Sequence, residues 1–212
     1  MVTSGHEVPE GIRADARENW PPRELIESFL GEDYLGFQFR PGEEAAIPAD
    51  DPEALAAARR FRDVMSLFAT GVAVITTVSN GEPVGMTCQS FSSVSLDPPL
   101  VLFCPMKTSR AWPRIQRSGK FCVNFLAAHQ SDVSNTMASR GADKFASIAW
   151  SPAPATGSPL LDEVLGYVDC TIHAVHEAGD HYIVIGRVQD LGGASLDHGL
   201  TFYRGRYGST EE

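Results

Sequence analysis

From residue 71 onward, the pattern of apolar and polar positions is that of a succession of short β-strands. The run 72–78 (VAVITTV) is β-branched and is followed by Asn80-Gly81, a strong hairpin signal. A mixed run, 83–95 (PVGMTCQSFSSVS), leads to a turn at Asp97-Pro98-Pro99, and the next run, 99–105 (PLVLFCP), is apolar throughout. A continuously apolar strand is expected where both faces of a sheet are covered.

Four later segments continue this pattern. The run 121–127 (FCVNFLA) is apolar, while 166–178 and 181–191 alternate well and are joined by Gly179-Asp180, which predicts a second hairpin. A last strand is expected at 200–207 (LTFYRGRY). Antiparallel strands joined by hairpins predict a mostly β protein with short helices, built as a closed or split β-barrel.

Short helices are expected between some of these strands. Thr108 or Ser109 is positioned to cap a helix that runs through Ile115 and ends before Ser118-Gly119. Ser131 or Asp132 is expected to open another helix, which Gly141 would stop. The segment 151–159 (SPAPATGSP) has the composition of a loop.

A longer helix precedes the first strand. Asp51 has the chemistry of an N-cap, and Pro52 suits the first helical position. The following sequence, EALAAARRFRDVMSLFA, has apolar residues at helical spacing, and we expect these side chains to face a core: Leu55, Phe61, Val64, Met65 and Phe68.

Residues 1–50 read as an N-terminal arm, partly helical or extended, ahead of a barrel domain at 51–212. The arm is rich in Pro, Gly and acids, and a short helix is expected at 23–30. It is either disordered or docked on the barrel or on a subunit partner. Its aromatic residues favour docking: Trp20, Phe29, Tyr34, Phe37 and Phe39.

Composition narrows the class of protein. A hydrophobic content of 43% and a charged content of 21% are ordinary for a soluble domain. The net charge of −10 argues against non-specific nucleic-acid binding, and no apolar run is long enough for a membrane helix. The four cysteines form no CxxC pair, which argues against a zinc site. Buried free thiols and the absence of a visible secretory signal favour a cytoplasmic protein.

Charge and hydroxyl groups gather in one stretch, 85–110 (GMTCQSFSSVSLDPPLVLFCPMKTSR). Its serines exceed what strand alternation explains, since Ser90, Ser92 and Ser95 share one face only if the strand contains a bulge. Lys107 and Arg110 follow the apolar run and favour an anionic ligand, such as a phosphate. If Lys107 and Arg110 are considered in isolation, the expected interpretation is instead a charged surface turn. No GxGxxG or Walker motif is present, so a Rossmann or P-loop site is not indicated.

The ordered phrases FATGVAVITT, PVGMTCQSFSSVSLDPPLVLFCPMKTSR, FCVNFL, GDH and FYRG closely resemble those of the short-chain flavin reductases, the reductase components of two-component flavin-dependent monooxygenases. The resemblance covers about residues 60–207, and residues 1–60 have no counterpart in compact members. CQSF and LVLFCP are similar to reductases that serve aromatic-ring hydroxylases, including those of steroid degradation. The family implies an FMN-binding split β-barrel of antiparallel Greek-key topology, usually a homodimer with the pocket near the subunit interface.

The resemblance also implies site residues. Flavin, FAD or FMN, would lie along Pro83, Val84, Gly85, Met86, Thr87, Gln89, Ser90, Cys104, Pro105, Met106, Lys107, Ser109, Arg110, Ala111, Thr136 and Met137. Ser92 and Ser93 remain unassigned. The nicotinamide nucleotide, NADH or NADPH, would meet His181, Phe202, Tyr203, Arg204 and Gly205. Of these, His181 would order the hydride donor, and it is the expected catalytic residue.

The expected chemistry asks little of the protein beyond positioning. Hydride would pass from nicotinamide to flavin, and reduced flavin would leave for a partner monooxygenase. This explains why no Ser-His-Asp or paired-carboxylate constellation stands out and why no metal is expected. The alternative is a split-barrel protein that holds flavin for sensing or electron storage without rapid turnover. The sequence does not decide between FAD and FMN, or between NADH and NADPH, and it does not identify the monooxygenase or its substrate.

Overall fold

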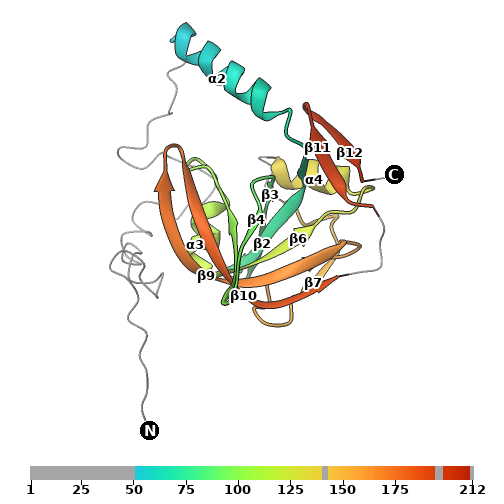
Figure 1. The fold of residues 1–212 in the computed structure, drawn as a ribbon. Helices are drawn as coiled ribbons and strands as arrows, with labels where there is room; N and C mark the ends of the chain where they lie inside the picture. The colour runs from blue at the N-terminus through green and yellow to red at the C-terminus, as the bar shows by residue number, and fades with distance from the viewer. Residues whose placement is uncertain (1–50, 140–142, 194–197, 211–212) are drawn as a thin grey trace.

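A computed structural model describes residues 51–139, 143–193 and 198–210 (Figure 1). The predictions made for residues 1–50 lie outside the described residues. The elements, in chain order, are α2 (Pro52–Met65), β1 (Thr70–Gly71), β2 (Ala73–Ser79), β3 (Glu82–Cys88), β4 (Ser92–Leu96), β5 (Pro99–Phe103), α3 (Trp112–Ser118), β6 (Lys120–Phe125), α4 (Ser131–Ala138), β7 (Trp150–Pro152), β8 (Pro159–Leu161), β9 (Gly166–Ala178), β10 (His181–Gly193), β11 (Leu200–Tyr203) and β12 (Arg206–Ser209).

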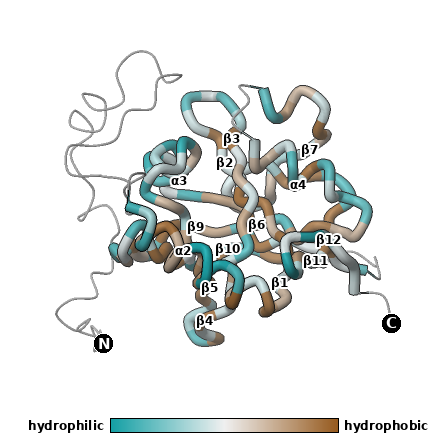
Figure 2. Tube along the Cα trace, turned by 90° about the horizontal axis from the view of Figure 1, so that it is seen from above, coloured by the Kyte–Doolittle hydropathy of each residue, from teal (hydrophilic) through white to brown (hydrophobic). Residues whose placement is uncertain are grey.

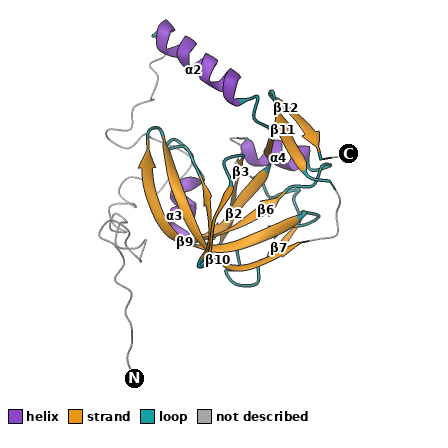
Figure 3. Cartoon of the chain, viewed as in Figure 1, coloured by secondary structure: helices purple, strands orange, loops and turns teal. Residues whose placement is uncertain are grey.

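Seven strands form one sheet in the order β3-β2-β6-β9-β10-β5-β4, and every pairing in it is antiparallel. The two edge strands, β3 and β4, are consecutive in the chain and are separated only by residues 89–91. This short link brings the two edges of the sheet together without pairing them, so the sheet curls into a barrel that stays split (Figure 3). The prediction of a mostly β, antiparallel fold is confirmed.

Two apolar clusters fill the molecule. The larger lies inside the curled sheet beneath α3, where Phe103 makes edge-to-face contacts with Trp112 and Phe121. The second lies where β2, α4 and the β11–β12 hairpin meet, and Met137 and Leu200 belong to it. The second cluster attaches α4 and the C-terminal hairpin to the barrel, and several of the predicted site residues lie on these two elements.

Several local predictions are confirmed. Asn80 and Gly81 both take positive φ in the turn between β2 and β3, and Gly179 takes positive φ between β9 and β10. A bulge, which the serine pattern left open, is present in β4, because its pairing with β5 changes register between Ser93 and Ser95.

The prediction that the long helix buries an apolar face is wrong for the single chain. Asp51 caps α2 as expected, with its carboxylate accepting from the backbone N–H groups of Glu53 and Ala54. No residue of α2 is buried, however, and Phe61 and Phe68 are 68% and 70% exposed. The helix projects from the barrel and joins it only through its C-terminal end (Figure 1). The helical spacing of apolar residues predicts an apolar face, but it does not identify the surface that the face packs against.

Other element boundaries differ from the predictions. The mixed run 83–95 is two strands, β3 and β4, because residues 89–91 turn the chain from one sheet edge to the other. The last strand is a hairpin, since Arg204 and Gly205 take positive φ between β11 and β12. The loop at 151–159 begins and ends in the paired strands β7 and β8. Each difference is a turn that local composition marks only weakly.

Both predicted short helices are present; α3 begins after the predicted residues, whereas α4 begins as predicted. α3 begins at Trp112 after Ala111 as N-cap and reaches Ser118, with Gly119 in the left-handed region. Ser109 still assists, because its Oγ accepts from the Trp112 backbone N–H at 3.3 Å. α4 begins at Ser131, one of the two residues expected to open it, and Gln130 takes the N-cap position.

Candidate functional site

Strand β3 lies at a sheet edge, and protein groups already contact its central glycine. A Cβ added at Gly85 would lie 2.6 Å from Met137 Sδ and 3.2 Å from Phe145 Cζ. The carbonyl oxygen of Gly85 accepts a hydrogen bond from Lys144 Nζ at 3.2 Å. The missing side chain is therefore explained by the close approach of Met137 of α4 and of Phe145. Its neighbours Met86 and Thr87 are only half-buried.

Ser90 joins the two halves of the stretch 85–110. Its Oγ accepts from the Cys104 backbone N–H at 2.9 Å and lies 3.3 Å from the Cys104 carbonyl oxygen. The same hydroxyl lies 3.3 Å from Cys88 Sγ at the end of β3. The end of β3 is thus held to the end of β5 across the open side of the barrel. Ser109, further along, reaches back to Met86 Sδ at 3.8 Å.

The turn after β5 meets the tip of the β9–β10 hairpin. Met106 and His181 form an isolated antiparallel bridge, and the Lys107 backbone N–H donates to the Asp180 carbonyl oxygen at 2.9 Å. Lys107 Nζ forms an ion pair with Glu177 at 3.1 Å and lies 5.6 Å from the centre of the Tyr182 ring. The predicted phosphate turn and the predicted nicotinamide histidine are therefore neighbours.

The His181 ring is oriented by the preceding residue. Its Nδ1 lies 2.8 Å from Asp180 Oδ1, and the side chain of His181 is 38% exposed. The hydrogen bond with His181 is the main cause that holds the pKa of the Asp180 carboxyl below its usual range. A bond at Nδ1 leaves Nε2 on the other side of the ring for a ligand.

The residues of the turn are suited to an anion. Arg110 is exposed, and within the described residues no carboxylate lies at ion-pair distance from it. Lys107 is only partly neutralised, because Glu177 is 76% exposed and screened by water. With the hydroxyls of Thr108 and Ser109 alongside, this donor set fits the phosphate of a flavin nucleotide.

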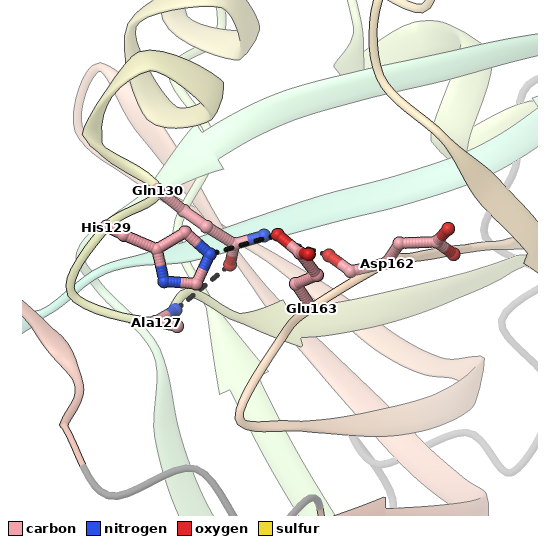
Figure 4. Close-up of polar contacts among 5 residues, drawn as sticks. All are labelled: Ala127, His129, Gln130, Asp162 and Glu163. Atoms are coloured by element: carbon pink, nitrogen blue, oxygen red, sulfur yellow. Dashed lines mark hydrogen bonds and ion pairs between the residues drawn. The ribbon is translucent and has the colours of Figure 1, made fainter.

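Helix α4 is held at its start by Gln130, as Figure 4 shows. The Gln130 side chain accepts from the Ala127 backbone N–H at 3.0 Å and donates to the Asp162 carbonyl oxygen at 2.8 Å. Beside it, His129 Nε2 lies 3.1 Å from Glu163 Oε2, an exposed contact (Figure 4). These bonds tie the start of α4 to the loop between β8 and β9.

The middle of α4 touches both β3 and the C-terminal hairpin through Ser134. Thr87 Oγ1 donates to the Ser134 carbonyl oxygen at 2.6 Å, and Tyr207 Oη donates to Ser134 Oγ at 2.9 Å. Tyr207 Oη also reaches Asn135 Oδ1 at 3.0 Å. The predicted flavin strand and the hairpin that carries Phe202 to Gly205 are therefore connected through one helix.

The second group of predicted nicotinamide residues lies on that hairpin, apart from His181. Phe202 pairs with Thr70 of β1 and packs edge-to-face on Tyr207, and the Arg204 backbone N–H donates to the Ser66 carbonyl oxygen. Tyr203 and Arg204 are exposed and stack on each other at 5.3 Å. In the part of the chain that is described, no hydrogen bond or ring contact joins this group to His181.

The remaining predicted flavin residues take ordinary places around this arrangement. Val84 and Pro105 are buried, Gln89 is exposed, and Pro83, Ala111 and Thr136 are half-buried. The structure thus brings together the β3 edge, the turn after β5, the hairpin tip and α4. Residues 202–205 are not part of this group and are connected to it through α4.

All four cysteines are free thiols. Cys88, Cys122 and Cys170 are buried, and Cys104 is half-buried. Burial raises the pKa values of the Cys88, Cys122 and Cys170 thiols, so these groups stay protonated and unreactive. Among the described residues, no group of three His, Cys, Asp or Glu side chains is placed to hold a metal ion. No described helix is long and apolar enough to span a membrane.

Three residues that shape the site were missed by sequence reasoning: Gln130, Lys144 and Tyr207. Each acts through a contact with a residue distant in sequence, and none belongs to a motif of the flavin stretch. Tyr207 had a weak signal, since it lies two residues after FYRG, at the end of the last predicted strand.

Comparison with known proteins gives a consistent picture. The family model described as "Flavin reductase like domain" matches residues 65–211. The reductase subunit HsaB of a flavin-dependent monooxygenase from Rhodococcus jostii is 51% identical over 153 residues, which are 72% of this chain and 78% of the relative. The flavin reductase of Pseudomonas putida is 47% identical over 149 residues, 70% of this chain and 87% of the relative.

Solved structures agree. The nitrilotriacetate monooxygenase component B homologue from Mycobacterium thermoresistibile superposes with a TM-score of 0.72 at 50% identity, covering 74% of this chain and 88% of the other. The NADH:FAD oxidoreductase SgcE6 of Streptomyces globisporus, in complex with NAD and FAD fragments, gives 0.67 at 34% identity, covering 77% and 95%. The fold predicted from the sequence is therefore confirmed at the level of the whole barrel.

Proposed function

The chain belongs to the flavin reductase-like domain family, and we propose that it is an NAD(P)H-dependent flavin reductase that supplies reduced flavin to a separate flavin-dependent monooxygenase. The observation that carries this is the match of the family model to residues 65–211, which include the whole barrel. The joining of the cationic turn at Met106 to His181 supports it, because both substrates of a hydride transfer must meet in one place.

In this function the flavin ring lies against the half-buried side chains of Met86 and Thr87 at the β3 edge. Arg110 and Lys107 meet its phosphate, and the hydroxyl of Ser109 lies between ring and phosphate positions. Ser90 holds β3 to Cys104, which fixes the distance between the ring half and the phosphate half of the site. The bound pair supplies the chemistry, which is hydride transfer from reduced nicotinamide to flavin.

His181 orders the nicotinamide. With Nδ1 held by Asp180, the ring presents Nε2 as a hydrogen-bonding group and its face as a stacking surface. Phe202 to Gly205 bind the remoter part of the nucleotide, and Arg204 supplies the cation for its phosphates. His181 and Arg204 lie on separate elements, which suits an extended dinucleotide better than a compact ligand.

We further assign NADH and FAD as the preferred pair. A relative from Kitasatospora aureofaciens, 37% identical over 70% of this chain and 78% of its own, carries the name flavin reductase (NADH). The Streptomyces structure is named an NADH:FAD oxidoreductase. FMN and NADPH are the alternatives that a kinetic comparison of the four cofactor pairs separates.

The exposed face of α2 supports a homodimer. Phe61, Val64 and Met65 lie at helical spacing in α2, Phe68 follows three residues after its end, and each residue is 51–70% exposed; Figure 2 shows apolar residues along α2. Four such side chains in water would leave a lone helix of this length marginal. A second copy that covers them would bury the apolar face predicted for this helix. The arm at residues 1–50 would contact the barrel or the second copy, and the buried free thiols suit a cytoplasmic protein.

Steady-state NADH oxidation with added FAD or FMN tests the function. We expect turnover that depends on free flavin and that passes reduced flavin to a flavin-dependent monooxygenase in a coupled assay. Tight flavin retention with no flavin-dependent turnover would instead support the alternative, a flavin-holding sensor or electron store. Sedimentation of the full chain tests the dimer, and a monomer at micromolar concentration would contradict it.

A further inference from the structure

Lys144 makes two hydrogen bonds to main-chain carbonyls of different elements. Its Nζ donates to the Met137 carbonyl oxygen, in the last turn of α4, at 2.6 Å and to the Gly85 carbonyl oxygen of β3 at 3.2 Å. Lys144 lies seven residues from Met137 and 59 residues from Gly85 in the sequence. The ammonium group therefore joins the helix to the sheet edge. Both acceptors belong to the stretches assigned to flavin.

The ammonium group has no carboxylate partner at ion-pair distance among the described residues. Burial alone lowers the pKa of Lys144, which marks a cation that is partly removed from water without a neutralising acid. An ordinary surface lysine would be solvated or paired with an acid. A desolvated ammonium group is stable when its N–H groups donate hydrogen bonds, and two of the three N–H groups of Lys144 donate to carbonyl oxygens.

A purely local explanation accounts for half of this geometry. Lysines near the C-terminal end of a helix commonly bond its last carbonyls and favour the negative end of the helix dipole. That explanation covers the bond to Met137 but not the bond to Gly85. The Gly85 bond acts where the Met137 side chain also presses on the strand, because a Cβ at Gly85 would lie 2.6 Å from Met137 Sδ.

We propose that Lys144 is a positioning residue for flavin binding, which holds the end of α4 against β3 and places a positive charge beside the flavin edge of that strand. The inference rests on the proposed function, since it takes β3 and α4 as parts of the flavin site. The ligand class is a flavin, whose ring has polar carbonyl edges and whose reduced form carries negative charge. Within the described residues the third N–H of Lys144 has no acceptor, and it would donate to the flavin.

The test compares Lys144→Met, Lys144→Arg and Lys120→Met by fluorescence titration with FAD, in the absence of nicotinamide. Lys120 is the matched control, because its Nζ also donates to a main-chain carbonyl, that of Thr156, away from β3 and α4. We expect Lys144→Met to raise the Kd for FAD about tenfold, Lys144→Arg to restore it to within about threefold, and Lys120→Met to leave it unchanged. In turnover, Lys144→Met should raise the KM for flavin and leave the KM for NADH near its wild-type value.

An unchanged Kd for FAD in folded Lys144→Met would overturn the proposal, as would an equal rise in Lys120→Met. Circular dichroism establishes folding, and if Lys144→Met does not fold, Lys144→Gln, which keeps a donor without charge, is measured against Lys120→Gln on the same criteria. Failure of the proposed function is distinguishable, because it appears as a wild-type chain that binds FAD without oxidising NADH. The titration does not depend on turnover.

Discussion

Met106 and His181 pair as an isolated antiparallel bridge, which joins the turn after β5 to the tip of the β9–β10 hairpin. The bridge is reinforced on both sides, by the Lys107 backbone N–H bonded to Asp180 and by the Tyr182 backbone N–H bonded to the Pro105 carbonyl oxygen. Two segments far apart in sequence thus hold a fixed register. The hairpin tip that carries His181 is therefore attached to the cationic turn.

His181→Ala should therefore weaken the use of nicotinamide while flavin binding remains. We expect the KM for NADH to rise about fivefold to tenfold, because a positioned ring that stacks on or bonds the nicotinamide contributes about 1 kcal/mol or somewhat more. The Kd for FAD should stay near its wild-type value, since the Met106 bridge is formed by backbone groups. His176→Ala is the control, because His176 is exposed on the same hairpin. Unchanged reduction kinetics would remove His181 from the site.

The same pair has a pH signature. The hydrogen bond with His181 lowers the pKa of Asp180 below the ordinary value for an aspartate, about 3.9. A lowered folded-state pKa stabilises the fold above the ordinary value, and that contribution is lost as pH falls through the lowered pKa. His181→Ala should raise the Asp180 pKa toward the ordinary value, as measured by carboxyl NMR titration from about pH 2 to 6. An identical Asp180 titration in the variant would contradict the assignment.

Ser90→Ala should loosen the junction between the two halves of the flavin stretch. The hydroxyl bonds both backbone groups of Cys104, and its loss should cost about 0.5–1.5 kcal/mol in the free energy of unfolding by urea. It should also raise the Kd for FAD, because β3 and the turn after β5 lose their fixed spacing. Ser92→Ala is matched, since that hydroxyl bonds only the neighbouring Ser93 carbonyl oxygen in the described structure. Equal effects of the two substitutions would count against a special role for Ser90.

Much of the barrel was predictable because its signals are local. Asn80-Gly81 fixes a hairpin, and the apolar run 99–105 contains the strand β5, although only Val101 and Phe103 of that strand are buried. The order of the strands in the sheet, with β3 and β4 at its two edges, has no such local signal. The family resemblance supplied the fold that local patterns left open between a closed and a split barrel.

The contacts that assemble the site were not predictable from pattern. Gly85 is expected along the flavin from the family resemblance, but no local pattern predicted that the Met137 side chain would approach it so closely that a Cβ at Gly85 would lie 2.6 Å from Met137 Sδ. Gln130 and Lys144 are polar residues without a motif, and their bonds to Asp162 and Gly85 join segments whose proximity depends on the whole fold. Helical periodicity likewise predicted an apolar face on α2 but gave no information about the surface that covers it.

The exposed face of α2 gives a prediction for assembly. Phe61→Glu together with Phe68→Glu should shift the proposed dimer toward monomer in sedimentation velocity, because two charges would have to be buried in the interface. The melting temperature of the barrel should change little, since α2 contributes no buried residue to it. Ala56→Glu is the control, because Ala56 is exposed and does not lie at the i, i+3, i+4 spacing of the apolar face. A dimer that survives the double substitution would place the interface elsewhere.

Substitution of Tyr207 tests whether α4 couples the hairpin proposed to bind nicotinamide nucleotide to the strand proposed to bind flavin. Its hydroxyl donates to Ser134 Oγ and Asn135 Oδ1, and the Ser134 carbonyl oxygen accepts from Thr87. Tyr207→Phe keeps the packing on Phe202 but removes these bonds, so the hairpin that carries Arg204 should lose its register on α4. We expect the KM for NADH to rise about threefold to tenfold with a stability loss of about 1 kcal/mol.

Tyr167→Phe is the matched control for this substitution, because the Tyr167 hydroxyl also donates to a side chain, Asp190 Oδ2 at 2.6 Å, but in the β9–β10 pair rather than on α4. Stopped-flow reduction of FAD at varied NADH separates affinity from the rate of the hydride step. A rise in the apparent NADH Kd with an unchanged limiting rate would place Tyr207 in nucleotide positioning. An unchanged NADH Kd with the same loss of stability would show that the Tyr207 bonds only hold the hairpin to the barrel, so that Arg204 binds nucleotide without help from α4.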